Sequence, residues 1–192
     1  MIGTSWGGLD AVSRILDGLD DAVRQPIVVV QHRSAESEDG ALAHLLSHHT
    51  RRIVADPDDK TELEPYHVYL GPPNYHVLVE EGHIALSTDE PVQYARPSID
   101  VLFETAADAY GARVIGIILT GANDDGAHGL ARIKESGGVA LIQDPEGAAR
   151  RTMPDAAIAG TVADAILPLK EIGKFVYGLC MEVSPVREAT GA

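Results

Sequence analysis

The sequence predicts a doubly wound α/β fold, with a mostly parallel sheet between two layers of helices. Three unbroken apolar runs, at residues 27–30, 114–119 and 139–143, have the composition of strands that are covered on both faces. Amphipathic helical stretches alternate with these runs, as is typical of the βαβ units of a Rossmann-like three-layer arrangement. We expect one added antiparallel hairpin, residues 75–79 and 83–86, because Gly82 supplies the positive φ that such turns need.

Size and composition favour one domain with a substantial core. The chain has 192 residues, of which 45% are hydrophobic, and this length gives little support for two domains. We expect a single domain over residues 1–182, followed by a frayed tail at 183–192.

Charge and cysteine content exclude several classes of protein. A net charge of −14, without a basic run, disfavours binding to nucleic acid or to an anionic membrane. The single cysteine, Cys180, excludes an internal disulfide and a cysteine metal cluster within one chain. No stretch approaches the roughly 18 apolar residues of a membrane span, and no signal peptide precedes the first helix. We therefore expect a soluble, cytoplasmic protein.

Helical periodicity predicts the helices in order along the chain, at residues 9–19, 41–49, 98–110, 127–135 and 169–181. A short strand is expected at 67–70, whereas residues 51–65 are acidic and turn-rich. Only Met1 and Ile2 precede the glycine-rich turn that begins at Gly3, which is too few for the whole strand that a nucleophile elbow normally follows, so a start inside that strand stays open.

Ser5 stands in the turn Gly3-Thr4-Ser5-Trp6-Gly7-Gly8, immediately before the first helix. The spacing G-x-S-x-G is that of a nucleophile elbow, in which the glycines allow a sharp turn and expose the hydroxyl. The same stretch is also compatible with a helix N-cap serine or with a backbone cradle for an anion. The turn by itself leaves these three interpretations open.

His32 and an aspartate follow two of the predicted central strands. His32 comes after residues 27–30, and the pair Asp124-Asp125 comes after residues 114–119. Because the carboxyl ends of parallel strands meet at one edge of a sheet, Ser5, His32 and one of the two aspartates can converge. A serine becomes a nucleophile when a histidine takes its proton and a carboxylate orients that histidine, so the sequence predicts a serine hydrolase.

A second pair of histidines has metal-ligand spacing. His44 and His48 stand four residues apart on one predicted helix, but the glutamate of H-E-x-x-H is absent because position 45 is a leucine. We interpret this pair as a solvated helix face, and we expect neither a metal nor an organic cofactor.

The chain resembles the catalytic domain of the chemotaxis receptor methylesterases, the CheB-type protein-glutamate methylesterases, over nearly its whole length. The resemblance lies in the order and spacing of seven segments: residues 3–8, Val30-Gln31-His32, Leu70-Gly71-Pro72, residues 96–103, Leu119-Thr120-Gly121, Asp125-Gly126-Ala127 and Met153-Pro154. It implies a triad of Ser5, His32 and Asp125 that removes methyl groups from glutamyl side chains in the cytoplasmic helical bundle of chemoreceptors. It also implies deamidation of receptor glutamines.

Two positions differ from the family pattern. Trp6 replaces the small residue that usually follows the nucleophile, and Ala122-Asn123 stands where the family typically has Met-Gly. An oxyanion donor from that loop would then be a backbone N–H, that of Ala122. A different ester or amide substrate and a non-catalytic anion-binding module are the alternative functions. We expect no phospho-acceptor receiver domain within these 192 residues, whether the catalytic part stands alone or belongs to a longer protein, and therefore an activity of this chain that does not respond to phosphodonors.

Overall fold

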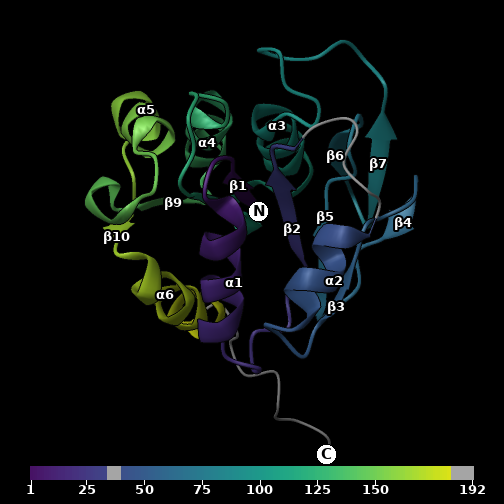
Figure 1. Cartoon of the computed structure of the whole chain (residues 1–192), viewed down its shortest axis with the longest axis horizontal. Helices are drawn as coiled ribbons and strands as arrows, with labels where there is room; N and C mark the ends of the chain where they lie inside the picture. Colours follow the sequence, from purple (N-terminus) through teal and green to yellow (C-terminus); the bar gives the residue numbers. More distant parts are fainter. Residues whose placement is uncertain (34–39, 183–192) are drawn as a thin grey trace, which may run out of the picture.

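The computed structural model describes residues 1–33 and 40–182, and its centre is a seven-stranded parallel sheet (Figure 1). The strands are β1 (Ile2–Thr4), β2 (Ile27–Gln31), β3 (Ile53–Ala55), β5 (His67–Leu70), β8 (Ile115–Ile118), β9 (Val139–Gln143) and β10 (Ala165–Leu167). Their order across the sheet is β10-β9-β8-β1-β2-β5-β3. The chain extends the sheet from β1 first in one direction and then in the other, so the predicted doubly wound fold is confirmed.

Helices cover both faces of this sheet (Figure 1). One layer contains α1 (Gly8–Gly18), α2 (Ala41–Ser47) and α6 (Leu169–Glu182), and the other contains α3 (Ile99–Tyr110), α4 (Ala127–Glu135) and α5 (Thr152–Gly160). Two short 3₁₀ segments, η1 (Gly111–Arg113) and η2 (Pro145–Gly147), complete the connections. The three layers correspond to the predicted arrangement.

The central strands are apolar throughout because successive side chains point to opposite, covered faces. In β2, Val28 and Val30 belong to the core beneath α3 and α4, whereas Val29 belongs to the core beneath α1 and α6. All three side chains are at most 1% exposed. A strand with one solvated face would instead alternate apolar and polar residues.

A small antiparallel sheet contains the predicted hairpin. Strands β6 (His76–Glu80) and β7 (His83–Ser87) pair across the turn at Gly82, whose φ is 86°, and β4 (Thr61–Glu62) adds a third strand. The hairpin is attached to the main domain through α3, because Val79 N–H donates to the Thr105 hydroxyl at 3.0 Å.

The first strand differs from the prediction. Gly3 and Thr4 belong to β1, which pairs with β2 and β8 in the middle of the sheet, so the turn begins only at Ser5. A Cβ on Gly3 would lie 2.2 Å from Ile99 Cγ2. Gly3 is therefore a strand residue that allows α3 to approach the sheet closely, and the assignment of Gly3 and Thr4 to the turn is wrong.

The stretch at 51–65 also contains more structure than predicted. It includes β3 at the edge of the main sheet and β4 in the small sheet. Strands of three and two residues carry no readable periodicity, which is why their composition indicated only turns. The predicted tail at 183–192 lies outside the described residues, and the single-domain assignment stays a prediction. No helix in the described part of the chain is long and apolar enough to cross a bilayer.

Candidate active site

Ser5 is the first residue after β1, and its backbone is held on both sides. Its N–H donates to Thr120 O at 3.0 Å, and its carbonyl accepts from Gln31 Nε2 at 2.7 Å and from Gly8 N–H at 3.0 Å. Helix α1 is capped by Gly7, at φ 80°, without a side-chain capping bond. The N-cap interpretation of Ser5 is therefore wrong, and the hydroxyl is available for another role.

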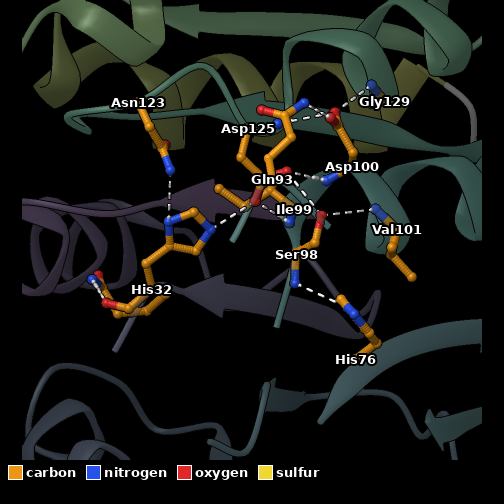
Figure 2. A network of polar contacts seen from close by, with 12 residues as sticks. His32, His76, Gln93, Ser98, Ile99, Asp100, Val101, Asn123, Asp125 and Gly129 are labelled. Atoms are coloured by element: carbon orange, nitrogen blue, oxygen red, sulfur yellow. Dashed lines mark hydrogen bonds and ion pairs between the residues drawn. The ribbon is translucent and has the colours of Figure 1, made fainter. Parts of the chain in front are cut away.

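His32 lies beside Ser5 because β1 and β2 are parallel and in register. Thr4 pairs with Gln31, and His32 N–H donates to Thr4 O at 3.0 Å, so the next pair along the two strands is Ser5 and His32. The His32 side chain is 14% exposed, and its Nε2 lies 2.7 Å from Asp125 Oδ2 (Figure 2).

Asp125 is fully buried, and both of its oxygens are occupied at the start of α3. Oδ2 accepts from His32 Nε2 and from Ile99 N–H at 2.7 Å, while Oδ1 accepts from Ser98 Oγ at 2.9 Å and Asp100 N–H at 3.0 Å. Burial alone would raise the pKa of Asp125, but the hydrogen bonds from His32, Ile99 and Asp100 together bring it below its usual value. The carboxylate is thus ionised at the positive end of a helix dipole.

Only one of the two neighbouring aspartates contacts the histidine. Asp124 is exposed to solvent, whereas Asp125 points into the protein towards His32. The structure therefore brings together His32 and Asp125, with Ser5 alongside, directly after β1.

The tautomer of His32 follows from its partner. An ionised carboxylate only accepts hydrogen bonds, so Nε2 carries the hydrogen in the neutral ring and Nδ1 carries the lone pair. Asn123 Nδ2 lies 3.4 Å from this Nδ1 and donates towards it, as Figure 2 shows. Within residues 1–33 and 40–182, no hydrogen bond joins Ser5 Oγ to the ring, and the buried Oδ1 of Asn123 has no partner.

A second buried carboxylate supports the first. Asp100, in the first turn of α3, accepts from the backbone N–H groups of Gly126 at 2.9 Å and Gly129 at 2.7 Å, and from Gln93 Nε2 at 3.3 Å. Burial raises the pKa of Asp100 to about 6, and the nearby charge of Asp125 adds to this rise. The two carboxylates therefore serve two different helix starts. Asp125, just before α4, binds N–H groups at the start of α3, and Asp100, in α3, binds N–H groups at the start of α4.

Sequence reasoning missed Asp100, and it also missed Ser98 and His76. Ser98 is fully buried, and its side chain caps α3. Its backbone N–H donates to His76 Nδ1 at 3.2 Å. A serine before an apolar helical stripe, with an aspartate two residues later, was a readable cap signal. Nothing in the sequence, however, indicated that this cap meets the loop after β8.

Several backbone N–H groups near Ser5 are unused. Among the described residues, the N–H groups of Trp6, Gly7 and Ala122 have no hydrogen-bond partner. Trp6 follows Ser5 directly, and Ala122 follows the loop residue Gly121, whose N–H is bound to Arg150 O at 3.1 Å. The N–H groups of Trp6, next to Ser5, and of Ala122 are candidate donors for an anion at the turn.

A surface cavity of about 470 Å³ opens beside the histidine. It is lined by His32, Arg33, Asn74, Pro91, Gln93, Tyr94, Ala95, Arg96, Pro97 and Asn123. The cavity is large enough for an extended side chain and gives access to the His32 ring.

The other pair of histidines forms no metal site in the described part of the chain. His44 and His48 are exposed on α2, with ring centroids 5.1 Å apart, and no cluster of three metal-ligating side chains occurs among the described residues. The interpretation as a solvated helix face agrees with this exposure.

The fold and these three side chains define a doubly wound α/β domain with a serine, a histidine and an aspartate at the carboxyl edge of its sheet. Residues 1–176 match the family model described as CheB methylesterase, and the chain belongs to that family.

Relatives and a solved structure agree with this assignment. A putative protein-glutamate methylesterase/protein-glutamine glutaminase from Leptospira interrogans is 45% identical over 180 residues, which are 93% of each chain. The protein-glutamate methylesterase FrzG of Myxococcus xanthus is 38% identical, over 90% of this chain and 52% of that longer protein. The crystal structure of the Thermotoga maritima CheB methylesterase catalytic domain matches with a TM-score of 0.85 and 30% identity, covering 93% of this chain and 96% of that one.

Proposed function

We propose that this chain is a serine hydrolase that removes methyl groups from glutamyl side chains of chemoreceptors and releases methanol. The observation that carries the proposal is the 2.7 Å contact between His32 Nε2 and the buried Asp125, with Ser5 at the end of the neighbouring strand β1. The names of the relatives support the substrate class, and the same acyl transfer would deamidate a receptor glutamine with ammonia as the leaving group.

The first half of the reaction forms an acyl-enzyme. Ser5 Oγ attacks the ester carbonyl while its proton passes to Nδ1 of His32, and the N–H groups of Trp6 and Ala122 stabilise the oxyanion. His32 then gives this proton to the departing methoxide. Asp125 keeps the other nitrogen protonated and stabilises the imidazolium.

The second half regenerates the enzyme. Water gives a proton to His32 Nδ1 and attacks the glutamyl-serine ester, after which the proton returns to Ser5 and the glutamate carboxylate leaves. Asn123 lies 3.4 Å from Nδ1, a long contact that the Ser5 hydroxyl or the water displaces when it approaches. This sequence of steps uses only side chains, backbone N–H groups and water.

The proposed partner is the cytoplasmic helical bundle of a methyl-accepting chemoreceptor, and the reaction would take place in the cytoplasm. A helix presents its side chains outwards, so an ester on its surface can enter the cavity beside His32.

The test is methanol release from methylated receptor by the purified chain and by its Ser5→Ala variant. We expect the variant to lose at least three orders of magnitude in turnover while remaining folded, because a nucleophile contributes only to the chemistry. Retention of more than about a tenth of the turnover would disprove the role of Ser5.

A fluorophosphonate probe distinguishes the alternatives. An activated Ser5 is labelled covalently, whereas a module that only binds anions is not. Labelling without methanol release would indicate a different ester or amide as substrate.

A further inference from the structure

Trp6 and Arg150 form a cation–π pair next to the proposed nucleophile. Trp6 directly follows Ser5, and its side chain is 63% exposed, which is unusual for the largest apolar residue. The Arg150 guanidinium carbon lies 5.5 Å from the centroid of the Trp6 ring, within the range of a cation–π contact.

A single buried residue fixes both members of this pair. The Thr120 hydroxyl accepts from the backbone N–H of Arg150 at 2.9 Å and donates to the backbone carbonyl of Trp6 at 2.9 Å. Thr120 itself is 2% exposed. The Thr120 carbonyl accepts from Ser5 N–H at 3.0 Å. The backbones that carry the nucleophile, the indole and the guanidinium are therefore held together, so the pair has a defined place beside Ser5.

Arg150 makes no ion pair within residues 1–33 and 40–182, unlike the other arginines nearby. Arg151 is paired with Asp155 at 2.6 Å, and Arg14 is paired with Asp10 at 2.9 Å. In a chain with a net charge of −14, an exposed arginine without a carboxylate is available to an anion from outside.

The chemistry of the pair fits a carboxylate. The exposed guanidinium lies over the indole ring and makes no side-chain hydrogen bond among the described residues, so its N–H groups are free to bind both oxygens of a carboxylate. In a helical substrate, residues three or four positions apart lie about 5–6 Å from each other. Consecutive Cα atoms such as those of Ser5 and Trp6 are about 3.8 Å apart. When the ester lies at Ser5, a substrate residue one helical turn away therefore has a spacing that matches the neighbouring residue Trp6.

We propose that Trp6 and Arg150 form a specificity site for an acidic residue about one helical turn from the methylated glutamyl residue. This inference rests on the proposed function, and it adds a sequence preference to it. It also gives Trp6 a role: the bulky residue after the nucleophile supports the cation that selects the substrate.

The experiment compares peptide methyl esters that differ at one position. Helical peptides with a single glutamyl methyl ester carry Glu, Gln or Lys at the third or fourth position before or after it, and kcat/KM is measured for each. We expect the Glu peptide in the best register to exceed its Gln counterpart by about fivefold at low salt, as an exposed ion pair allows. The preference should decrease as salt is added, because exposed charges are screened.

Substitutions assign the preference to the pair. Arg150→Ala should abolish the ratio between the Glu and Gln peptides, and Arg150→Glu should invert it, because like charges repel. Trp6→Phe should keep most of the preference and Trp6→Leu should lose part of it, since only the former retains a ring. The matched control is Arg151→Ala, an adjacent exposed arginine already paired with Asp155, and it should leave the ratio unchanged.

Several outcomes would overturn the inference. Equal kcat/KM for the Glu and Gln peptides in every register would do so, as would a preference that survives Arg150→Ala. Preference for the Lys peptide would instead assign recognition to Asp10, Asp144 and Glu146, which line a cavity of about 430 Å³ on the α1 side of the turn. Failure of the proposed function looks different, because then no peptide is hydrolysed and Ser5 is not labelled by fluorophosphonate.

Discussion

Replacing Asp125 by asparagine tests the proposed mechanism most directly, because the side chain keeps its shape and loses its charge. When His32 takes the serine proton, the imidazolium lies 2.7 Å from the carboxylate. At an effective dielectric constant of about 20, two unit charges at that separation attract by about 6 kcal/mol. We therefore expect Asp125→Asn to lower kcat about 10⁴-fold, since each 1.36 kcal/mol is a factor of ten.

The substitution should also cost some stability, which has to be separated from the chemistry. An asparagine can turn its oxygen towards His32 and Ile99, but its NH₂ group then faces the N–H of Asp100, which loses its acceptor. One unsatisfied buried N–H costs about 1–3 kcal/mol in the free energy of unfolding. Urea unfolding measures that loss, and kcat is compared at a temperature where both proteins are folded.

The control is Asp124→Asn, the same substitution at the preceding, exposed residue. It should change kcat by less than about twofold, because surface substitutions away from such contacts are close to neutral. If Asp125→Asn retained more than about a tenth of kcat, or if Asp124→Asn were the more damaging of the two, the assignment of Asp125 would be refuted.

Three further predictions concern stability and control. Asp100→Asn should change the pH dependence of unfolding: the pKa of Asp100 is raised from 3.8 to about 6 in the folded state, so the wild type loses stability as pH rises from about 4 to 6, and the variant should lose less over that range in urea melts. Gly3→Ala should cost about 1–3 kcal/mol of stability because its Cβ meets Ile99, whereas Gly18→Ala, in open space at the end of α1, should be neutral or slightly stabilising; equal thermal shifts would contradict the close approach of α3. The 192-residue chain should hydrolyse ester at the same rate with and without acetyl phosphate, because its family match at residues 1–176 is to the methylesterase part; a reproducible stimulation would show a phospho-acceptor within it.

The main sheet could be predicted because its central strands consist of uninterrupted apolar residues. Val28, Val29 and Val30 are each buried on one face or the other, and an uninterrupted β-branched run is what such burial selects. The same reasoning predicted that Ser5, His32 and one aspartate of the 124–125 pair converge, since a parallel sheet collects its strand ends at one edge, and the family resemblance then selected Asp125.

The rest depends on contacts between distant segments, which no local pattern encodes. Asp100 and Ser98 were readable as helix-start residues, but their contact with the loop after β8 arises only when α3 packs on the sheet. In that packing Ile99 leaves no room for a side chain at residue 3. The sequence did not show this, because the first glycine of a G-x-S-x-G pattern is naturally assigned to the turn. Asn123 was recognised as a departure from the family pattern, although its contact with His32 Nδ1 depends on how the loop folds back.

The hydrogen bonds that Asp125 and Asp100 accept at the starts of α3 and α4 link the proposed active site to the folding of these two helices. Asp125 binds the first N–H groups of α3, and Asp100 binds those at the start of α4, so neither helix end can open without releasing a charge inside the core. The proposed triad carboxylate is thereby held by the same hydrogen bonds that satisfy the start of α3, so its orientation is tied to the folding of that helix end. Such an arrangement also restricts evolution: the carboxylate cannot move to another position, such as that of Asp124, unless α3 acquires new acceptors for the N–H groups of Ile99 and Asp100.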